Sequence, residues 1–107
     1  MSLIDIPTEA VKMKNHEPEE LTLLVKSSTS ATSLGSMLAR CIYEGKRVTL
    51  RAIGASAVNQ AAKAVPIAQG HAAPKGHHLA VSISFFDSDI QGQKKTGLQF
   101  RITDIAR

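Results

Sequence analysis

The side chains that could do chemistry in this chain are cations and amides close to the ends of predicted strands. Lys26 ends the first predicted strand, Arg51 lies in the second, and Lys63 lies on the helix after it. Cations gathered at one end of a sheet can hold phosphate groups. The alternative is that they are solvated charges, which is the commoner state of a surface lysine.

A glycine and two amides beside these cations leave two interpretations open. Gly54 opens a predicted helix, and Asn59 and Gln60 follow within its first turns. Together they could form a polar rim where the free N–H groups of a helix start receive a phosphate. Alternatively, Gly54 serves the turn and the two amides cap or brace neighbouring loops, because a lone glycine is a weak sign of a phosphate site.

A second basic group lies in residues 87–95, which we predict to be the polar loop of a hairpin with Gly92 inside it. Lys94 and Lys95 on such a flexible tip would suit contact with a nucleic-acid backbone regardless of sequence. Loop tips also carry basic residues that have no binding role.

The histidines and the single cysteine give weaker signals. His71, His77 and His78 have no Asp, Glu or Cys at ligand spacing, and adjacent histidines beside a strand would point to opposite faces, so we predict no metal site. Cys41 lies on an apolar helix face, where we expect a small buried hydrophobe.

The three phenylalanines offer little for stacking on bases. Phe85 and Phe100 fall on the faces that we predict to point into the core. Only Phe86 is left as a candidate for stacking, and it is a weak one.

Nothing in the sequence has the pattern of an active site. The chain has no paired-carboxylate arrangement, no Ser/His/Asp constellation and no nucleotide-binding fingerprint. We therefore predict a protein that is not an enzyme and needs no cofactor.

Charge is divided unevenly along the chain. Residues 1–20 hold two lysines against five acids, a net charge of −3, whereas residues 21–107 hold eleven Lys and Arg against four acids, a net charge of +7. A basic small domain attracts polyanions, nucleic acid first, through long-range attraction and counterion release. The plainer alternative is that the excess charge only keeps the protein soluble.

The chain carries no sign of export or of a membrane span. The start of the sequence lacks the basic and apolar stretches of a signal peptide, and no apolar run approaches the ~18 residues of a membrane helix. We predict a cytoplasmic protein with no membrane partner.

Hydrophobic periodicity predicts four strands and two helices after an acidic, flexible leader at residues 1–20, in which Leu3, Ile4 and Ile6 could add a short extended piece. The elements are a strand at 21–26, a helix at 33–44, a strand at 47–53, a helix at about 55–68, a loop at 70–76, and hairpin strands at 79–85 and 98–103. The domain thus spans residues 21–107.

The second helix contains an anomaly. Its predicted apolar stripe includes Val58, Ala61, Ala62 and Val65. Pro66 removes the hydrogen bond to the carbonyl of Ala62, so we expect the helix to kink or end near Val65.

The order β-α-β-α-β-β predicts an α/β fold of the α+β two-layer type, with two helices on one face of a four-stranded mixed sheet. The first β-α-β unit should be a right-handed parallel crossover and the last two strands an antiparallel hairpin. The outward face of the sheet would carry polar side chains, including Thr49, Arg51, Ser82 and Arg101.

Residues 51–65 (RAIGASAVNQAAKAV) closely resemble the stage V sporulation protein S family. The resemblance continues through 67–70 (IAQG) and 73–76 (APKG), reaches back to 25–28 (VKSS), and covers about residues 21 to 105. That family in turn resembles the Alba superfamily of small dimeric chromatin and RNA-binding proteins, which has the same element order.

The resemblance implies an Alba-like homodimer in which basic residues after the first strand, at the second strand–helix junction and on the final hairpin contact nucleic acid. Carried onto this sequence, these positions are Lys26, Arg51, Asn59, Gln60, Lys63, Lys94 and Lys95.

Two functions remain open. The first is DNA or RNA binding, mostly independent of sequence, in bacterial development, sporulation or gene regulation, by a protein that could associate with the nucleoid. The second is a regulatory module that keeps the Alba fold and binds a protein partner or a small ligand.

Overall fold

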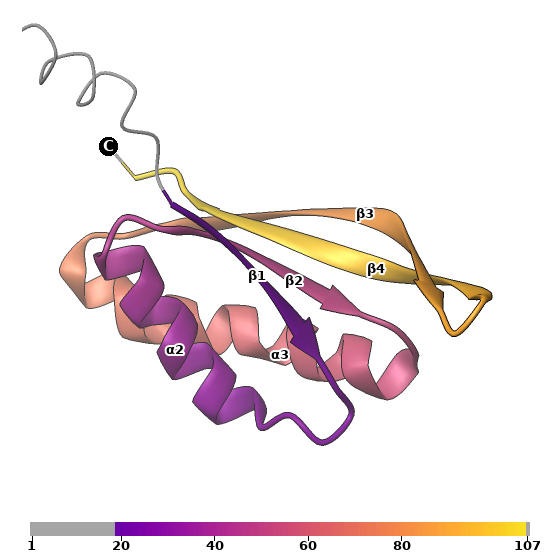
Figure 1. The fold of residues 1–107 in the computed structure, drawn as a ribbon. Helices are drawn as coiled ribbons and strands as arrows, with labels where there is room; N and C mark the ends of the chain where they lie inside the picture. Colours follow the sequence, from indigo (N-terminus) through magenta and orange to yellow (C-terminus); the bar gives the residue numbers. More distant parts are fainter. Residues whose placement is uncertain (1–18, 107) are drawn as a thin grey trace, which may run out of the picture.

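Four strands and two helices follow one another in the computed structural model, which describes residues 19–106 (Figure 1). They are β1 (Glu20–Val25), α2 (Ala31–Tyr43), β2 (Arg47–Ala52), α3 (Ala55–Ala72), a 3-10 turn η1 (Ala73–Lys75), β3 (Leu79–Ile90) and β4 (Gln93–Asp104). The predicted order β-α-β-α-β-β is confirmed. The expected leader, with its possible extended piece at Leu3, Ile4 and Ile6, lies outside the described residues except for Glu19 and Glu20.

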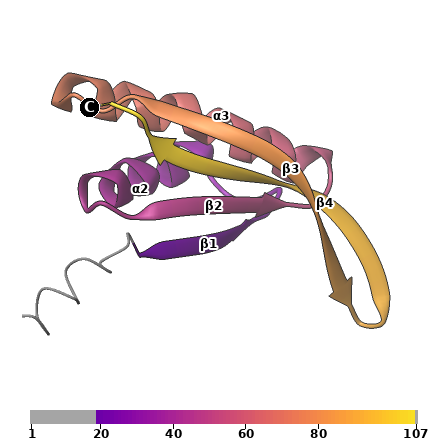
Figure 2. The same ribbon diagram turned by 90° about the horizontal axis from the view of Figure 1, so that it is seen from above.

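The sheet has the strand order β1-β2-β4-β3. β1 and β2 are parallel, and β4 pairs antiparallel with both β2 and β3, so the sheet is mixed as predicted. Both helices lie on one side of the sheet and leave its other side open, as Figures 1 and 2 show. This α+β sandwich is consistent with the expected Alba-like fold.

The core lies between the helices and the two central strands. Val48 and Leu50 of β2 and Ile102 of β4 are fully buried against Leu38 of α2. Their spacing follows the expected alternation along strands and the 3.6-residue period of a helix. Cys41 is also buried, and burial raises the pKa of its thiol, so the prediction of a small hydrophobe is confirmed.

The expectation that α3 ends near Val65 is wrong, because α3 runs without interruption to Ala72. Pro66 lies on the exposed side of the helix, and the residue whose hydrogen bond it removes, Ala62, is exposed as well. Water can therefore satisfy the freed carbonyl. The predicted loop at 70–76 is correspondingly shortened to η1 and Gly76. No helix within residues 19–106 is long and apolar enough to cross a membrane.

The buried side of α3 also differs from the predicted stripe. Only Ala61 of that stripe is fully buried; Val58 and Val65 pack partly against the core and Ala62 is exposed. The buried face consists of alanines, namely Ala57, Ala61, Ala64, Ala68 and Ala72. Small side chains let α3 approach the sheet and α2 closely, and at Gly35 of α2 an added Cβ would lie only 2.4 Å from Cγ2 of Ile67.

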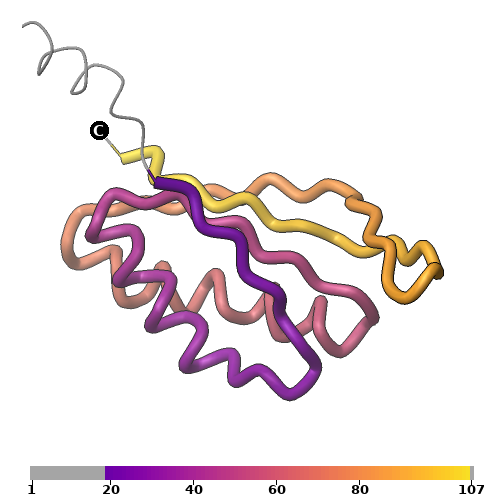
Figure 3. The backbone as a smooth tube through the Cα atoms, viewed as in Figure 1, coloured from indigo at the N-terminus to yellow at the C-terminus, as the bar shows by residue number. Residues whose placement is uncertain are grey.

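The final hairpin is longer than predicted. β3 and β4 pair from Leu79 with Asp104 out to Ile90 with Gln93, so the expected loop at 87–95 is wrong. The turn consists of Gln91 and Gly92, both with positive φ, as two-residue hairpin turns of type I′ require. The outer half of the hairpin reaches beyond the helices (Figure 3).

Candidate nucleic-acid interface

A hollow of about 380 Å³ opens where the two parallel strands end. β1 ends at Val25 and β2 at Ala52, and α3 begins directly after β2. The carboxyl ends of parallel strands meet at the same edge of a sheet, where ligand sites commonly form. We call this the strand-end hollow; it is lined by Leu24, Val25, Lys26, Ser27, Ile53, Gly54, Ala55, Ser56 and Ala57.

The start of α3 contributes hydrogen-bond donors to the strand-end hollow. Gly54 is the N-cap residue, with φ 95° and no capping side chain, and the first turn holds no acidic residue. The first helical hydrogen bond is made by the N–H of Val58, so the N–H groups of Ala55, Ser56 and Ala57 have no partner within the helix. These groups and the helix dipole favour a bound anion.

Lys26 faces this helix start across the strand-end hollow, since both line it. Its backbone N–H donates to Oγ1 of Thr29, which fixes the loop after β1 and leaves the exposed ammonium group available. The structure thus brings Lys26 and the Gly54 junction together, as the sequence predicted.

Arg51 lies on the open face of the sheet at the rim of the strand-end hollow, where its cross-strand partner is Leu24. Its Nε donates to Oε1 of Gln99 over 3.1 Å, and its guanidinium lies 4.9 Å from the centre of the Phe86 ring. The side chain is therefore held in place while remaining exposed.

The two amides on α3 have different roles. Nε2 of Gln60 donates to the carbonyl of Thr29 over 2.7 Å, so Gln60 braces the loop between β1 and α2. The bracing interpretation applies to this residue. Asn59 and Lys63 lie one turn apart on the exposed side of α3, outside the lining of the strand-end hollow.

Lys94 and Lys95 belong to β4, and the prediction that they form a flexible tip is wrong. They pair with Asp89 and Ser88 of β3, and as successive strand residues they point to opposite faces of the hairpin. Both are exposed. Regular cross-strand pairing holds them on a ribbon that reaches past the helices (Figure 3), from the same end of the sheet at which β2 ends.

The phenylalanines differ from the prediction in one respect. Phe100 is buried as expected, but Phe85 is 78% exposed. It points to the helix side of the sheet, opposite Leu98, on the edge strand β3. Phe86 is half-buried under Arg51, so its ring is not a free platform for a base.

Sequence reasoning missed Ser27 and Ser56, whose positions in the lining of the strand-end hollow add hydroxyl groups to it. Ser27 directly follows Lys26, and Ser56 is the second residue of α3. The available signal was that polar residues directly after parallel strands gather at one edge of the sheet.

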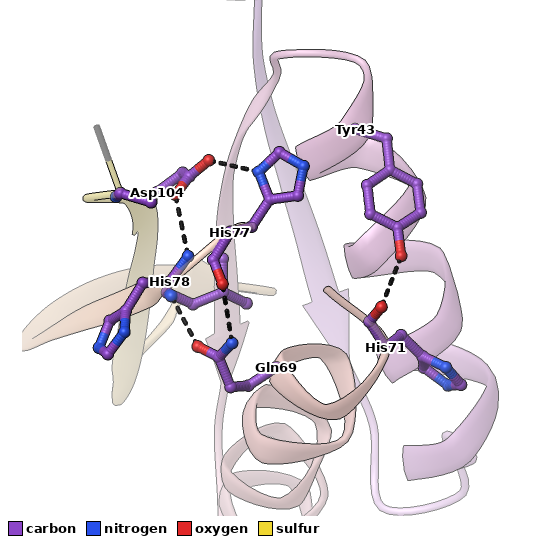
Figure 4. A network of polar contacts seen from close by, with 8 residues as sticks. Tyr43, Gln69, His71, His77, His78 and Asp104 are labelled. Atoms are coloured by element: carbon purple, nitrogen blue, oxygen red, sulfur yellow. Dashed lines mark hydrogen bonds and ion pairs between the residues drawn. The ribbon is translucent and has the colours of Figure 1, made fainter. Parts of the chain in front are cut away.

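The opposite end of the sheet is closed by polar contacts among three elements (Figure 4). Gln69 of α3 donates to the carbonyl of His77 and accepts from the N–H of Leu79. Asp104 accepts from the N–H groups of His78 and Ala106, and its Oδ2 lies 2.6 Å from Nδ1 of His77. These contacts fix the start of β3 against α3 and the end of β4.

The hydrogen bond from His77, followed by those from the backbone N–H groups, holds the pKa of Asp104 below its ordinary value. A depressed folded-state pKa stabilises the fold above the ordinary Asp pKa of about 3.9, and this contribution is lost as the pH falls through the folded value.

An Asp104→Asn variant should therefore be less stable than the parent at pH 7, by about 1–2 kcal/mol in the free energy of unfolding. The two stabilities should converge as the pH falls below about 4. Urea unfolding between pH 7 and pH 3 measures this, and a constant difference across that range would show that the Asp104 carboxylate is not the titrating group.

A family model matches most of this chain. Described as Stage V sporulation protein S, it covers residues 21–105 and so includes the strand-end hollow, both helices and the whole hairpin.

Proposed function

Since this chain belongs to the stage V sporulation protein S family, and is therefore a sporulation-related protein, we propose that it binds the backbone of nucleic acid with little sequence preference. The observation that carries the proposal is the strand-end hollow, where Lys26 faces the uncapped start of α3. A phosphate there would meet an ammonium group and backbone N–H donors together.

The donors in the strand-end hollow favour backbone contact over base readout. Lysine and backbone N–H groups recognise phosphate oxygens, which are the same in every sequence. Arg51 at the rim and Lys63 further along α3 extend the positive charge on either side. The net charge of +7 over residues 21–107 supplies the long-range attraction that nucleic-acid binding of this kind requires.

The hairpin supplies a second contact in this proposal. Lys94 and Lys95 lie on a ribbon that projects beyond the helices, so a long polyanion could touch both the hairpin and the strand-end hollow. A small ligand could not reach both.

We also propose that the chain acts as a homodimer through an apolar strip on the helix side of β3, which we call the β3 strip. It consists of Val81, Ile83 and Phe85, exposed by 40%, 55% and 78%. The strip is continuous along one face of an edge strand, and a second copy would cover it.

Salt-dependent binding of a short duplex tests the nucleic-acid proposal. Lys26→Ala should weaken binding several-fold and reduce the slope of log affinity against log salt by about one unit, and the Lys94→Ala/Lys95→Ala pair by up to about two units. The losses should be about equal for duplexes of different sequence, because the lost contacts are to phosphate.

Lys75→Ala is the matched control, since Lys75 lies in η1, near the ring of Tyr43 and away from the strand-end hollow. It removes the same charge and should leave the salt slope close to that of the parent. If no variant changes the slope, or if the parent does not bind duplex at low salt, the proposal fails. The module that binds a protein or small ligand would then be the better description.

A further inference from the structure

A second basic site lies on the open face of the sheet, at the end away from the strand-end hollow. Thr49 of β2 pairs in register with Arg101 of β4, and both point away from the helices. Arg47 and Thr103 lie two residues further along the same face, toward the same end of the sheet. The two arginines are therefore diagonal neighbours, with the two threonines between them.

These four side chains surround a hollow of about 200 Å³, which we call the outer-face pocket. Its lining also includes Glu20 at the start of β1 and Ile102. Water occupies about 30 Å³ per molecule, so this volume accommodates a tetrahedral oxyanion together with a few waters. Neither helix covers this face of the sheet (Figure 2).

The charges of the outer-face pocket do not cancel within the described part of the chain. Arg101 forms no ion pair with any carboxylate in residues 19–106. Arg47 has Glu20 as its partner, but the atoms are 3.8 Å apart and both side chains are more than half exposed. Such a pair contributes little, so two guanidinium groups face one weakly held carboxylate.

We propose that the outer-face pocket binds a single phosphate group. Guanidinium groups form paired hydrogen bonds with phosphate oxygens, and two of them, set diagonally, can hold one tetrahedral group from two sides. The hydroxyl groups of Thr49 and Thr103 stand between them as further donors. The group could be the phosphate of a small monoester or free phosphate, or it could belong to a nucleic-acid chain.

Glu20 regulates this site in the proposal, because its carboxylate and a phosphate compete for the guanidinium of Arg47. Removing that carboxylate should tighten phosphate binding, whereas removing either arginine should weaken it. A nonspecific effect of net charge on a basic protein would have the same two signs, so an arginine outside the pocket is needed as a control of equal charge.

The experiment is a titration of the full chain with inorganic phosphate at constant ionic strength, followed by NMR of the backbone N–H groups and the arginine Nε–H groups. It is run about one pH unit above the second pKa of inorganic phosphate, so that most of the phosphate is dianionic. We expect saturable shifts at Thr49, Arg101 and Thr103. Arg101→Gln and Arg47→Gln should each weaken binding about tenfold or more, and Glu20→Gln should tighten it several-fold.

Arg40→Gln is the matched control, because Arg40 is an exposed arginine on α2, in the helix layer. It should leave the phosphate affinity unchanged. Equal weakening by Arg40→Gln and Arg101→Gln in folded protein, or weaker binding by Glu20→Gln, would overturn the proposal.

A second arm distinguishes the two sources of the phosphate group. If the phosphate shifts persist in the presence of saturating duplex, the pocket takes a small phosphate and is independent of the nucleic-acid interface. If duplex displaces phosphate and Arg101→Gln weakens duplex binding, the source is the nucleic-acid chain. Failure of duplex binding alone leaves the first arm intact, so the two proposals fail separately.

Discussion

A Phe85→Asp variant is expected to be monomeric at protein concentrations at which the parent should form the proposed dimer. Phe85 is the most exposed member of the β3 strip, and a second copy that covers the strip would bury the new carboxylate without a partner. Burying an unpaired charge costs several kcal/mol, so the dimer should weaken by at least about a hundredfold. Light scattering and sedimentation measure the change directly.

Ser82→Asp is the control for this variant, since Ser82 lies on the same strand and points to the other face of the sheet. It adds the same charge and should leave the dimer intact. A parent that is monomeric at about tens of micromolar would contradict the dimer itself. A dimeric Phe85→Asp protein would place the interface elsewhere.

Loss of the dimer should also affect duplex binding in a length-dependent way. A dimer presents two strand-end hollows, and a duplex that reaches both gains from the high effective concentration of the second contact. Phe85→Asp should therefore weaken binding of long duplexes and leave binding of a duplex that fits one hollow unchanged.

Replacing Gly97 with alanine is expected to lower the free energy of unfolding by about 2–3 kcal/mol. A Cβ at this buried position would lie 2.4 Å from the carbonyl oxygen of Ala52 and 2.7 Å from Cε1 of Phe86. The first of these atoms belongs to the backbone of β2, which pairs with β4 there and cannot move without opening the sheet.

Gly70→Ala offers a contrast with the same chemical change. Gly70 lies in α3 with nothing within 4 Å of an added Cβ, so alanine should stabilise the helix there by about 0.5–1 kcal/mol. Chemical denaturation measures the free energy of unfolding of both variants, which should fall for Gly97→Ala and rise for Gly70→Ala. A Gly97→Ala protein as stable as the parent would mean that β2 and β4 separate easily beside the strand-end hollow.

The elements that could be predicted are those whose pattern is local. Val48, Leu50 and Ala52 alternate along β2, and the apolar residues of α2 recur at helical spacing, so a short window contained the signal. The length of the hairpin was underestimated because its outer half carries many polar residues. Two of them, Asp87 and Thr96, hydrogen-bond to each other across the strands. Exposed on both faces, such strands look like a loop in sequence.

The course of α3 depended on information that a local pattern lacks. A proline usually ends or kinks a helix, but here buried alanines on either side of Pro66, such as Ala64 and Ala68, pack both halves of α3 into the core. Tertiary packing outweighs the lost hydrogen bond. A stripe of alanines is also a weaker hydrophobic signal than Val58 and Val65, which is why the predicted stripe was centred on the valines.

The two candidate sites also differ in how far the sequence could predict them. The meeting of Lys26 and Gly54 follows from the rule that parallel strands end at one edge, so it could be foreseen. The outer-face pocket requires the register of β2 against β4, which brings Thr49 opposite Arg101 across some fifty residues of sequence. Arg101 and Thr49 were both placed on the open face correctly, but their direct pairing could not be inferred from the pattern.

The two hydrogen bonds of Gln69 bear on how sequences of this family should be compared. Its amide donates to the carbonyl of His77 and accepts from the N–H of Leu79, two residues further along the chain. Glutamine is the side chain of its length that offers both a donor and an acceptor. Glutamate would lose the donor, and leucine would lose both. A requirement for glutamine at this position would therefore come from its hydrogen bonds to main-chain atoms. An invariant glutamine here would indicate a structural role, although an invariant polar side chain is usually taken to mark an active site.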